Sequence, residues 1–334
     1  MKPKVIVFTK IQQEVLNYIG ETCSVTYFEH LNPSNYPDFL LALGEAEGIL
    51  GYGIKVDKEL LDYAPRLKVV STLSVGYEAL NIAELTARRI LATNLSDVSN
   101  DSIADVIFAL ILATARRIPE LDQFVKKGNW KQKVISEDLF GVDVHHKVLG
   151  IIGMGRIGTA IAKRAHHGFD MRILYHNRSR NEEAERMYEA QYCCLDELLK
   201  QSDFVCLMTP LTAETENLMG IREFQLMKKT AIFINGSRGT TVNEKDLIFA
   251  LQNQWILAAG LDVYEKEPVD PHNPLVKMKN VVTVPHIGPA TLETLLNMGM
   301  LAAKNLVQGL TGQKPQNLIN PEVLANLTSR KFRD

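Results

Sequence analysis

Three glycines in the middle of the chain have the spacing of a phosphate-binding turn. An apolar run at residues 148–152 is followed by the pattern G-x-G-x-x-G, formed by Gly153, Gly155 and Gly158. In a strand–turn–helix unit the first glycine permits a tight turn and the second lets the backbone approach a pyrophosphate. The third lets the helix pack closely on the strand. Because the helix N-terminus adds amides and a partial positive charge, this glycine turn (153–158) predicts a dinucleotide site.

The next expected strand, 171–175, leads into a turn that bears on the choice of cofactor. Proteins of this kind that bind NAD usually carry an acidic residue about 20 residues beyond the first glycine, where it accepts hydrogen bonds from the ribose 2′-OH. Here no carboxylate precedes Glu182, and the turn consists of Asn177, Arg178, Ser179 and Arg180. This basic turn (177–180) favours a 2′-phosphate, so we expect NADP(H) to be preferred and NAD(H) to be possible. We expect Arg178, and after it Arg180, to bind the phosphate; the alternative is a solvated turn that tolerates either cofactor.

Three chemically capable side chains follow later expected strands, at the edge where parallel sheets bind their ligands. They are Arg238, Glu267 and His286. A guanidinium can bind a carboxylate and a keto oxygen in a fork, and an imidazole can exchange a proton near neutral pH. A carboxylate can orient that imidazole and favour its cationic form. Each residue alone has an ordinary structural explanation, but the combination suits hydride transfer, in which a proton must also move.

The elements that must position these residues form two alternating series. Strands are expected at residues 5–8, 25–28, 48–51, 68–71 and 90–92, with helices at 12–19, 36–43 and 58–63 between them. A second series has strands at 148–152, 171–175, 203–208, 231–235, 259–263 and 280–284. Strands that alternate with helices predict doubly wound parallel sheets, and two series predict two α/β domains.

The nucleotide-binding series lies inside the other one. We place a substrate domain at residues 1–101 and 288–334, and a nucleotide-binding domain at 102–287. Long helices at 102–117 and 291–310 are expected to link them, and the C-terminal tail is expected to return to the first domain. Segment 122–146 has weak periodicity and predicts an arm that packs on another subunit.

Composition excludes several other classes of protein. The 334 residues carry a formal net charge of −2, so nothing favours a nucleic-acid partner. No apolar run approaches the roughly 20 residues that cross a bilayer, and the chain enters a strand directly, without a signal-peptide core. We therefore expect a cytoplasmic protein with no membrane partner. The four cysteines have no metal-ligand spacing, so no metal is expected: Cys23, Cys193, Cys194 and Cys206.

The whole chain resembles the D-isomer-specific 2-hydroxyacid dehydrogenases. The motifs that carry the resemblance are S-V-G-Y at 74–77, L-G-I-I-G-M-G-R-I-G at 149–158, N-G-S-R-G at 235–239, G-L-D-V-Y-E-K-E-P at 260–268 and P-H-I-G at 285–288. Within this family the chain is most similar to the glyoxylate/hydroxypyruvate reductases that also act as 2-ketogluconate reductases. The segments that carry this closer similarity are 143–149, 164–169 and 202–207.

The resemblance implies roles for individual residues. Arg238, Glu267 and His286 would be the catalytic residues, with Arg238 and His286 also contacting the substrate. Backbone amides near Val75 and Gly76 would receive the substrate carboxylate. The cofactor would be bound by the glycine turn, including Arg156 and Ile157, by the basic turn, and by Thr209, Pro210, Asp262 and Ser102. Of these, Arg156 and Ile157 would meet the pyrophosphate, Thr209 and Pro210 the adenosine side, and Asp262 the nicotinamide carboxamide.

The resemblance also implies a Rossmann domain inserted into a flavodoxin-like substrate domain, and a homodimer. The chain departs from the family pattern at several positions. Ser96 stands where a proline is usual, and Pro289 replaces a small residue after the histidine motif. Asn81 ends a divergent stretch, E-A-L-N at 78–81, but can still cap the following helix.

The favoured function is an NADPH-preferring reductase of small 2-keto acids, with His286 as acid and base. Glyoxylate, hydroxypyruvate and 2-ketogluconate are the expected substrates, and D-2-hydroxy acids the products. One alternative is an NAD-dependent dehydrogenase of another D-2-hydroxy acid, such as phosphoglycerate or lactate. Another is a nucleotide-sensing scaffold that resembles the corepressors of this superfamily.

Overall fold

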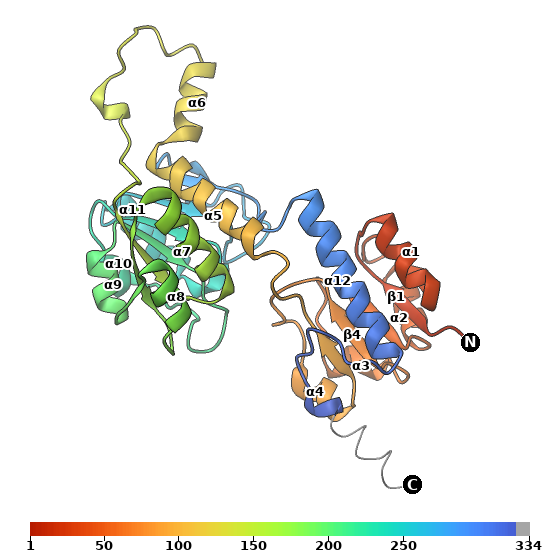
Figure 1. Ribbon diagram of the computed structural model, residues 1–334. Helices are drawn as coiled ribbons and strands as arrows, with labels where there is room; N and C mark the ends of the chain where they lie inside the picture. The colour runs from red at the N-terminus through yellow and green to blue at the C-terminus, as the bar shows by residue number, and fades with distance from the viewer. Residues whose placement is uncertain (325–334) are drawn as a thin grey trace. The chain divides into compact units, whose positions relative to one another are not determined.

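The computed structural model describes residues 1–324 and divides into two units. One unit is Met1–Ser99 together with the chain from Ala290 onward, and the other is Asn100–Pro289. Each is built on one parallel sheet (Figure 1), so the doubly wound α/β class is confirmed. The divisions lie after residues 99 and 289, where the sequence placed them after 101 and 287.

The first unit has a five-stranded sheet in the order β2-β1-β3-β4-β5, which is the flavodoxin-like order. These strands are Ser24–Tyr27, Lys4–Val7, Gly48–Gly51, Val69–Thr72 and Leu91–Thr93. Residues alternate between the two faces: Val5 and Val7 pack with helices α1 (Gln13–Thr22) and α12 (Leu292–Leu310). The opposite face is covered by α2, α3 and α4, which span Tyr36–Leu43, Lys58–Asp62 and Ile82–Ala87.

Two departures from the family pattern have clear local consequences in this unit. The Asn81 side chain accepts a hydrogen bond from the Glu84 amide at 3.0 Å, so it caps α4 as expected. The Ser96 hydroxyl accepts a hydrogen bond from the Asn317 side chain. A proline at this position could not accept that bond, because its side chain has no oxygen. The C-terminal segment runs antiparallel beside β5, where the Ile319 amide donates to the Ala92 carbonyl at 2.8 Å.

The second unit has a seven-stranded sheet in the order β8-β7-β6-β9-β10-β11-β12. In that order the strands are Gln191–Tyr192, Arg172–His176, Val148–Ile152, Phe204–Leu207, Ile232–Asn235, Ala258–Leu261 and Val281–Thr283. Chain order reverses between β6 and β9, as in Rossmann sheets, and every neighbouring pair is parallel. All carboxyl ends of these strands therefore meet at one edge.

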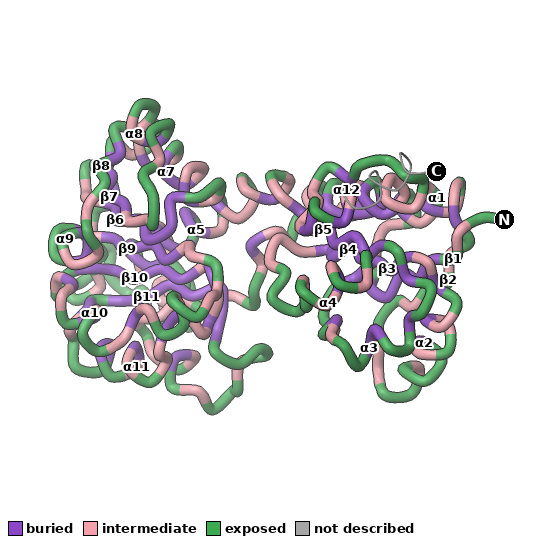
Figure 2. The backbone as a smooth tube through the Cα atoms, turned by 90° about the horizontal axis from the view of Figure 1, so that it is seen from below, coloured by how far each residue is buried: buried purple, intermediate pink, exposed green. Residues whose placement is uncertain are grey.

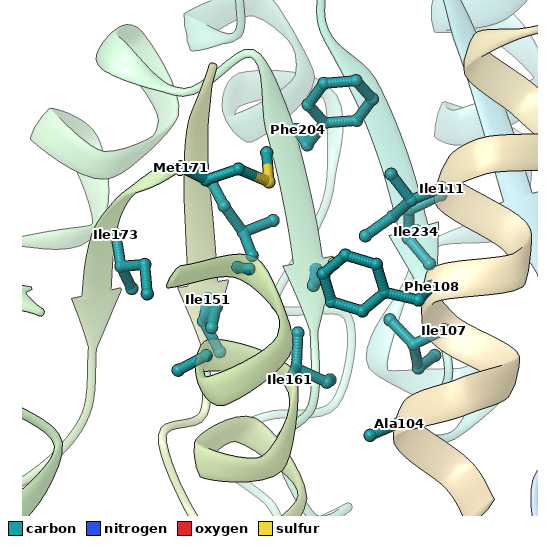
Figure 3. Packing of buried hydrophobic residues seen from close by; sticks show 14 of the residues in the cluster. Ala104, Ile107, Phe108, Ile111, Ile151, Ile161, Met171, Ile173, Phe204 and Ile234 are labelled. Atoms are coloured by element: carbon teal, nitrogen blue, oxygen red, sulfur yellow. The ribbon is translucent and has the colours of Figure 1, made fainter. Parts of the chain in front are cut away.

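Both faces are covered at the centre of this sheet, where every residue of β9, β10 and β11 is buried (purple in Figure 2), whereas the edge strand β8 is exposed. In β9, Phe204 and Cys206 join one core cluster, whereas Val205 and Leu207 join the other. Helices α5 (Asn100–Ala115), α7 (Arg156–Phe169) and α8 (Glu182–Tyr188) cover the first face; Figure 3 shows side chains of α5 and α7 packed over it. The second face is covered by α9, α10 and α11, which span Leu195–Gln201, Ile221–Leu226 and Glu244–Gln252.

An arm of residues 118–141 projects from this unit, drawn in yellow in Figure 1. It begins with helix α6 (Ile118–Lys126), which the weak periodicity from residue 122 did not predict. Pro119 starts this helix at a position where proline costs no hydrogen bond. No residue of α6 is buried, and the arm exposes several large apolar side chains: Ile118, Val125, Trp130, Val134, Ile135 and Phe140.

None of the helices in residues 1–324 is both long and apolar enough to cross a bilayer. Over the same residues, no three His, Cys, Asp or Glu side chains lie where they could hold a metal ion. Candidate ligand-binding residues lie at the carboxyl ends of the strands.

Candidate functional site

The glycine turn has the shape that its spacing predicts. Gly153 follows β6 with φ +105°, and a Cβ on it would lie 2.7 Å from the Met208 carbonyl. A Cβ on Gly158 would lie 2.3 Å from the Gly153 oxygen. Both glycines are therefore required for packing. Gly155 differs, because a Cβ there would meet nothing within 4 Å, which leaves open space beside the α7 N-terminus.

The residues around this turn fit a bound dinucleotide. Arg156 and Ile157 are the first residues of α7, so their amides belong to the group that a helix leaves without intrahelical partners. Thr209 follows β9 and lies against Gly153; its hydroxyl is buried without a hydrogen-bond partner in the described residues. A buried hydroxyl of this kind calls for a ligand or water. Pro210 next to it is exposed.

The basic turn is attached to the glycine turn by two asparagines. The Asn177 side chain accepts a hydrogen bond from the Met154 amide at 3.0 Å and donates to its carbonyl at 3.3 Å. Asn181 donates to the same carbonyl at 3.0 Å and caps α8 through the Ala184 amide. Asn177, predicted as a phosphate ligand, thus also holds the turn in place. Arg178 and Ser179 are exposed.

Arg238 is held by a buried polar network. The Asn235 side chain accepts hydrogen bonds from the Ser237 amide and hydroxyl, at 3.0 and 2.9 Å. The Arg238 carbonyl accepts one bond from Asn235 at 3.2 Å and another from Thr241 at 2.6 Å. Gly239 then allows the turn to lie directly on the backbone of Tyr264, because a Cβ there would be 1.8 Å from the Tyr264 carbonyl carbon.

Glu267 and His286 form a direct pair. The Nδ1 atom of His286 lies 2.7 Å from Oε2 of Glu267, and both side chains are partly exposed. A carboxylate only accepts hydrogen bonds, so Nδ1 carries the proton and Nε2 is left for another partner. The second oxygen of Glu267 accepts a bond from the Tyr264 amide at 3.0 Å, which fixes the carboxylate plane.

The backbone of His286 has the left-handed φ of +51°, which is uncommon outside glycine. Asp262, directly after β11, stabilises the backbone that follows His286. Its two oxygens accept hydrogen bonds from the Ile287 amide at 2.6 Å and the Gly288 amide at 3.0 Å. Burial raises the pKa of Asp262, and these amide bonds oppose that effect. The Ser102 hydroxyl donates to the Gly288 carbonyl at 3.0 Å.

Asp262 and Ser102 were predicted as cofactor ligands, and the structure gives each a further task in holding the histidine loop. Those cofactor roles stay predictions. The supporting residues Asn235, Asn181 and Tyr264 were not predicted as site residues. Asn181 had a sequence signal, since an asparagine before a run of helix formers predicts an N-cap.

Val75 and Gly76 lie in the first unit, in the loop after β4. The Asn94 side chain donates to the Val75 carbonyl at 2.7 Å, and the Ser74 hydroxyl to the Gly76 carbonyl at 2.5 Å. These bonds fix the carbonyls of the loop. The role of its amides in substrate binding stays a prediction.

The glycine turn generates a paired prediction. Gly155→Ala should leave the thermal unfolding midpoint nearly unchanged, because the new methyl meets open space, yet weaken dinucleotide binding by about tenfold or more. Gly158→Ala should instead lower stability by about 2 kcal/mol or more, because its methyl meets backbone. Thermal unfolding and fluorescence titration with reduced cofactor measure the two effects. Equal loss of stability in both variants would contradict this division of roles.

Comparison with known proteins identifies the family. Residues 108–288 match the family model described as D-isomer specific 2-hydroxyacid dehydrogenase, NAD binding domain. The chain is 48% identical over 323 residues to glyoxylate/hydroxypyruvate reductase B of Klebsiella pneumoniae, covering 97% of this chain and 100% of that protein. It is 45% identical over 324 residues to the protein of the same name from Yersinia pestis, covering 97% and 99%.

Solved structures of related proteins are similar to this chain over nearly its whole length. An NADPH-dependent glyoxylate/hydroxypyruvate reductase from Sinorhizobium meliloti, in complex with NADP and malonate, is similar with a TM-score of 0.83 at 28% identity, over 96% of this chain and 97% of that one. The TT0316 protein of Thermus thermophilus gives 0.88 at 35% identity, over 95% and 99%. The chain therefore belongs to the D-isomer specific 2-hydroxyacid dehydrogenase family and is an NAD(P)-dependent oxidoreductase.

Proposed function

We propose that this protein is an NADPH-preferring reductase of glyoxylate and hydroxypyruvate, and also of 2-ketogluconate, and that it forms D-2-hydroxy acids. The observation that carries the proposal is the 2.7 Å pair of Glu267 and His286, on the same unit as Arg238 and the glycine turn. The names of the relatives at 45–48% identity support this substrate class. We place the activity in the cytoplasm, a reducing compartment that suits four free cysteines.

The residues divide the chemistry among them. A reduced nicotinamide cofactor, held by the glycine turn and the basic turn, would supply the hydride for reduction of the keto group. Arg238 binds the substrate carboxylate and polarises the keto oxygen through its planar guanidinium. His286 donates the Nε2 proton to that oxygen as it becomes an alkoxide, and Glu267 stabilises the cationic imidazole through Nδ1 before the transfer. We assign the amides of Val75 and Gly76 to the substrate carboxylate as well.

The proposal is tested by the decay of reduced-nicotinamide absorbance, with NADPH and NADH in parallel against each 2-keto acid and pyruvate. We expect turnover of glyoxylate or hydroxypyruvate, faster with NADPH. Decay with NADH alone would overturn the cofactor preference. An absence of decay with all of these acids would overturn the substrate class.

His286→Ala should lower kcat by about 100-fold or more, because the general acid is lost, and should change the NADPH dissociation constant little. His272→Ala is the matched control, since it removes an exposed imidazole from the same unit. Steady-state kinetics and cofactor titration of both variants measure the effects. A kcat near that of the unmodified protein in His286→Ala would remove this residue from proton transfer.

Arg178→Asp should shift the ratio of kcat/KM for NADPH to that for NADH toward NADH by about tenfold or more. The reason is that a charge-assisted contact to the 2′-phosphate becomes a repulsion. Arg186→Gln, on the exposed side of α8, controls for loss of a nearby positive charge. An unchanged ratio in Arg178→Asp would mean that another group binds the 2′-phosphate.

We also propose that the protein is a homodimer joined through the arm. The support is the arm's surface: α6 has no buried residue, and the exposed side chains include Trp130, Val134 and Phe140. Isolated exposed apolar residues are ordinary, but a group of them on a projecting segment marks an interface. We expect light scattering after gel filtration to give twice the chain mass of 37.4 kDa, and Val134→Glu/Phe140→Glu to give monomers. If the double variant still forms a dimer, the arm is not the dimer interface.

A further inference from the structure

We propose that Arg180 sets the preference for NADPH without contacting the 2′-phosphate, by pairing with Glu185 and neutralising its charge beside the basic turn. This inference rests on the proposed preference for NADPH. It makes Arg180 a positioning residue that determines specificity, and it reserves the phosphate contact for Arg178.

Arg180 forms an ion pair with Glu185. The Nε and Nη2 atoms of Arg180 lie 2.9 and 2.7 Å from the two carboxylate oxygens, which makes a bidentate pair. The guanidinium also lies over the Tyr192 ring, with its carbon 5.8 Å from the centroid. The Nε and Nη2 atoms and the face of the guanidinium are therefore engaged within the protein, which holds the Arg180 side chain against Glu185 and Tyr192.

Glu185 is fixed on its other side by a buried tyrosine. The Tyr175 hydroxyl donates to Oε1 of Glu185 at 2.6 Å and accepts a hydrogen bond from the Asn181 amide at 2.8 Å. The Arg180 hydrogen bond first, and then the bond from Tyr175, lower the pKa of Glu185. The carboxylate is therefore charged at neutral pH, and it is turned back toward the strand end that carries the basic turn.

The pairing of Arg180 with Glu185 reduces the repulsion between the carboxylates of α8 and a bound 2′-phosphate. The first turn of α8 contains Glu182, Glu183 and Glu185, which suit the positive end of the helix dipole. The same carboxylates repel a 2′-phosphate bound at the turn just before them. Glu182 and Glu183 are exposed and screened by solvent, whereas Glu185 is half-buried, so its charge acts more strongly. Arg180 cancels that charge.

Arg178 differs from Arg180 in its contacts within the protein. It makes no hydrogen bond or ion pair within residues 1–324, and its side chain is exposed. A hydrogen bond from Thr212 first, and more weakly the charge of Arg178, lower the pKa of Glu214. Arg178 is therefore able to turn to a phosphate. The two arginines of the basic turn thus have different tasks.

The test is a charge-rescue cycle measured by binding, with NADPH and NADH titrated by nicotinamide fluorescence. The variants are Arg180→Gln, Glu185→Gln and the double variant. Arg180→Gln should weaken NADPH binding by about fivefold, more at low salt than at high salt, and leave NADH binding unchanged. The double variant should bind NADPH within about twofold of the unmodified protein, because the exposed carboxylate is gone.

Arg186→Gln on the same helix is the matched control and should bind both cofactors normally. Thermal unfolding shows that each variant is folded. NADPH binding that stays weak in the double variant would show direct contact between Arg180 and the phosphate and would overturn the inference. Unchanged binding in Arg180→Gln would overturn it too. If the unmodified protein binds NADPH no more tightly than NADH, the proposed preference itself fails, which is a separate result.

Discussion

The candidate site depends on one buried carboxylate. Asp262 directly follows β11 and accepts hydrogen bonds from the two amides that follow His286. Those bonds offset the cost of the left-handed backbone at His286, which is of the order of 1–3 kcal/mol for a residue of this kind. With the backbone fixed there, the imidazole meets Glu267 through Nδ1 and leaves Nε2 for the substrate.

The rest of the site follows from the parallel sheet. Strands β10, β11 and β12 are neighbours, so the residues after them come together although they are distant in sequence. Tyr264 connects all three of these segments. Its backbone lies under Gly239, its amide binds Glu267, and its hydroxyl donates to the Val284 carbonyl at 3.0 Å. Burial raises the pKa of Tyr264 to about 12, so the hydroxyl stays a donor at neutral pH.

Much of this could be predicted from the sequence, because the signals were local. An apolar run that stops at Gly153 predicted the strand at 148–152, and an amphipathic segment predicted the helix at 36–43, both with their observed bounds. The two-residue strand β8 was missed because it is too short to show a hydrophobic period. Helix α6 was missed although Ile118, Leu121 and Val125 recur at helical spacing, because this pattern starts before residue 122, where the expected arm begins. The division of labour between Arg178 and Arg180 was also hidden, because it depends on Glu185 and Tyr175 reaching back from other elements. The use of Asp262 depends likewise on the sheet, which brings it to a loop 25 residues away in sequence.

The measurement that tests this account most directly is the kcat of Asp262→Asn with hydroxypyruvate, alongside its NADPH dissociation constant. The two loop amides donate to different oxygens of Asp262, and an asparagine replaces one of those oxygens with an NH2 group that cannot accept a hydrogen bond. We expect kcat at saturating NADPH to fall by about tenfold or more, while the NADPH dissociation constant reports separately on the predicted contact of Asp262 with the nicotinamide carboxamide. A variant that keeps the kcat of the unmodified protein would show that Asp262 does not position His286, and would contradict the account.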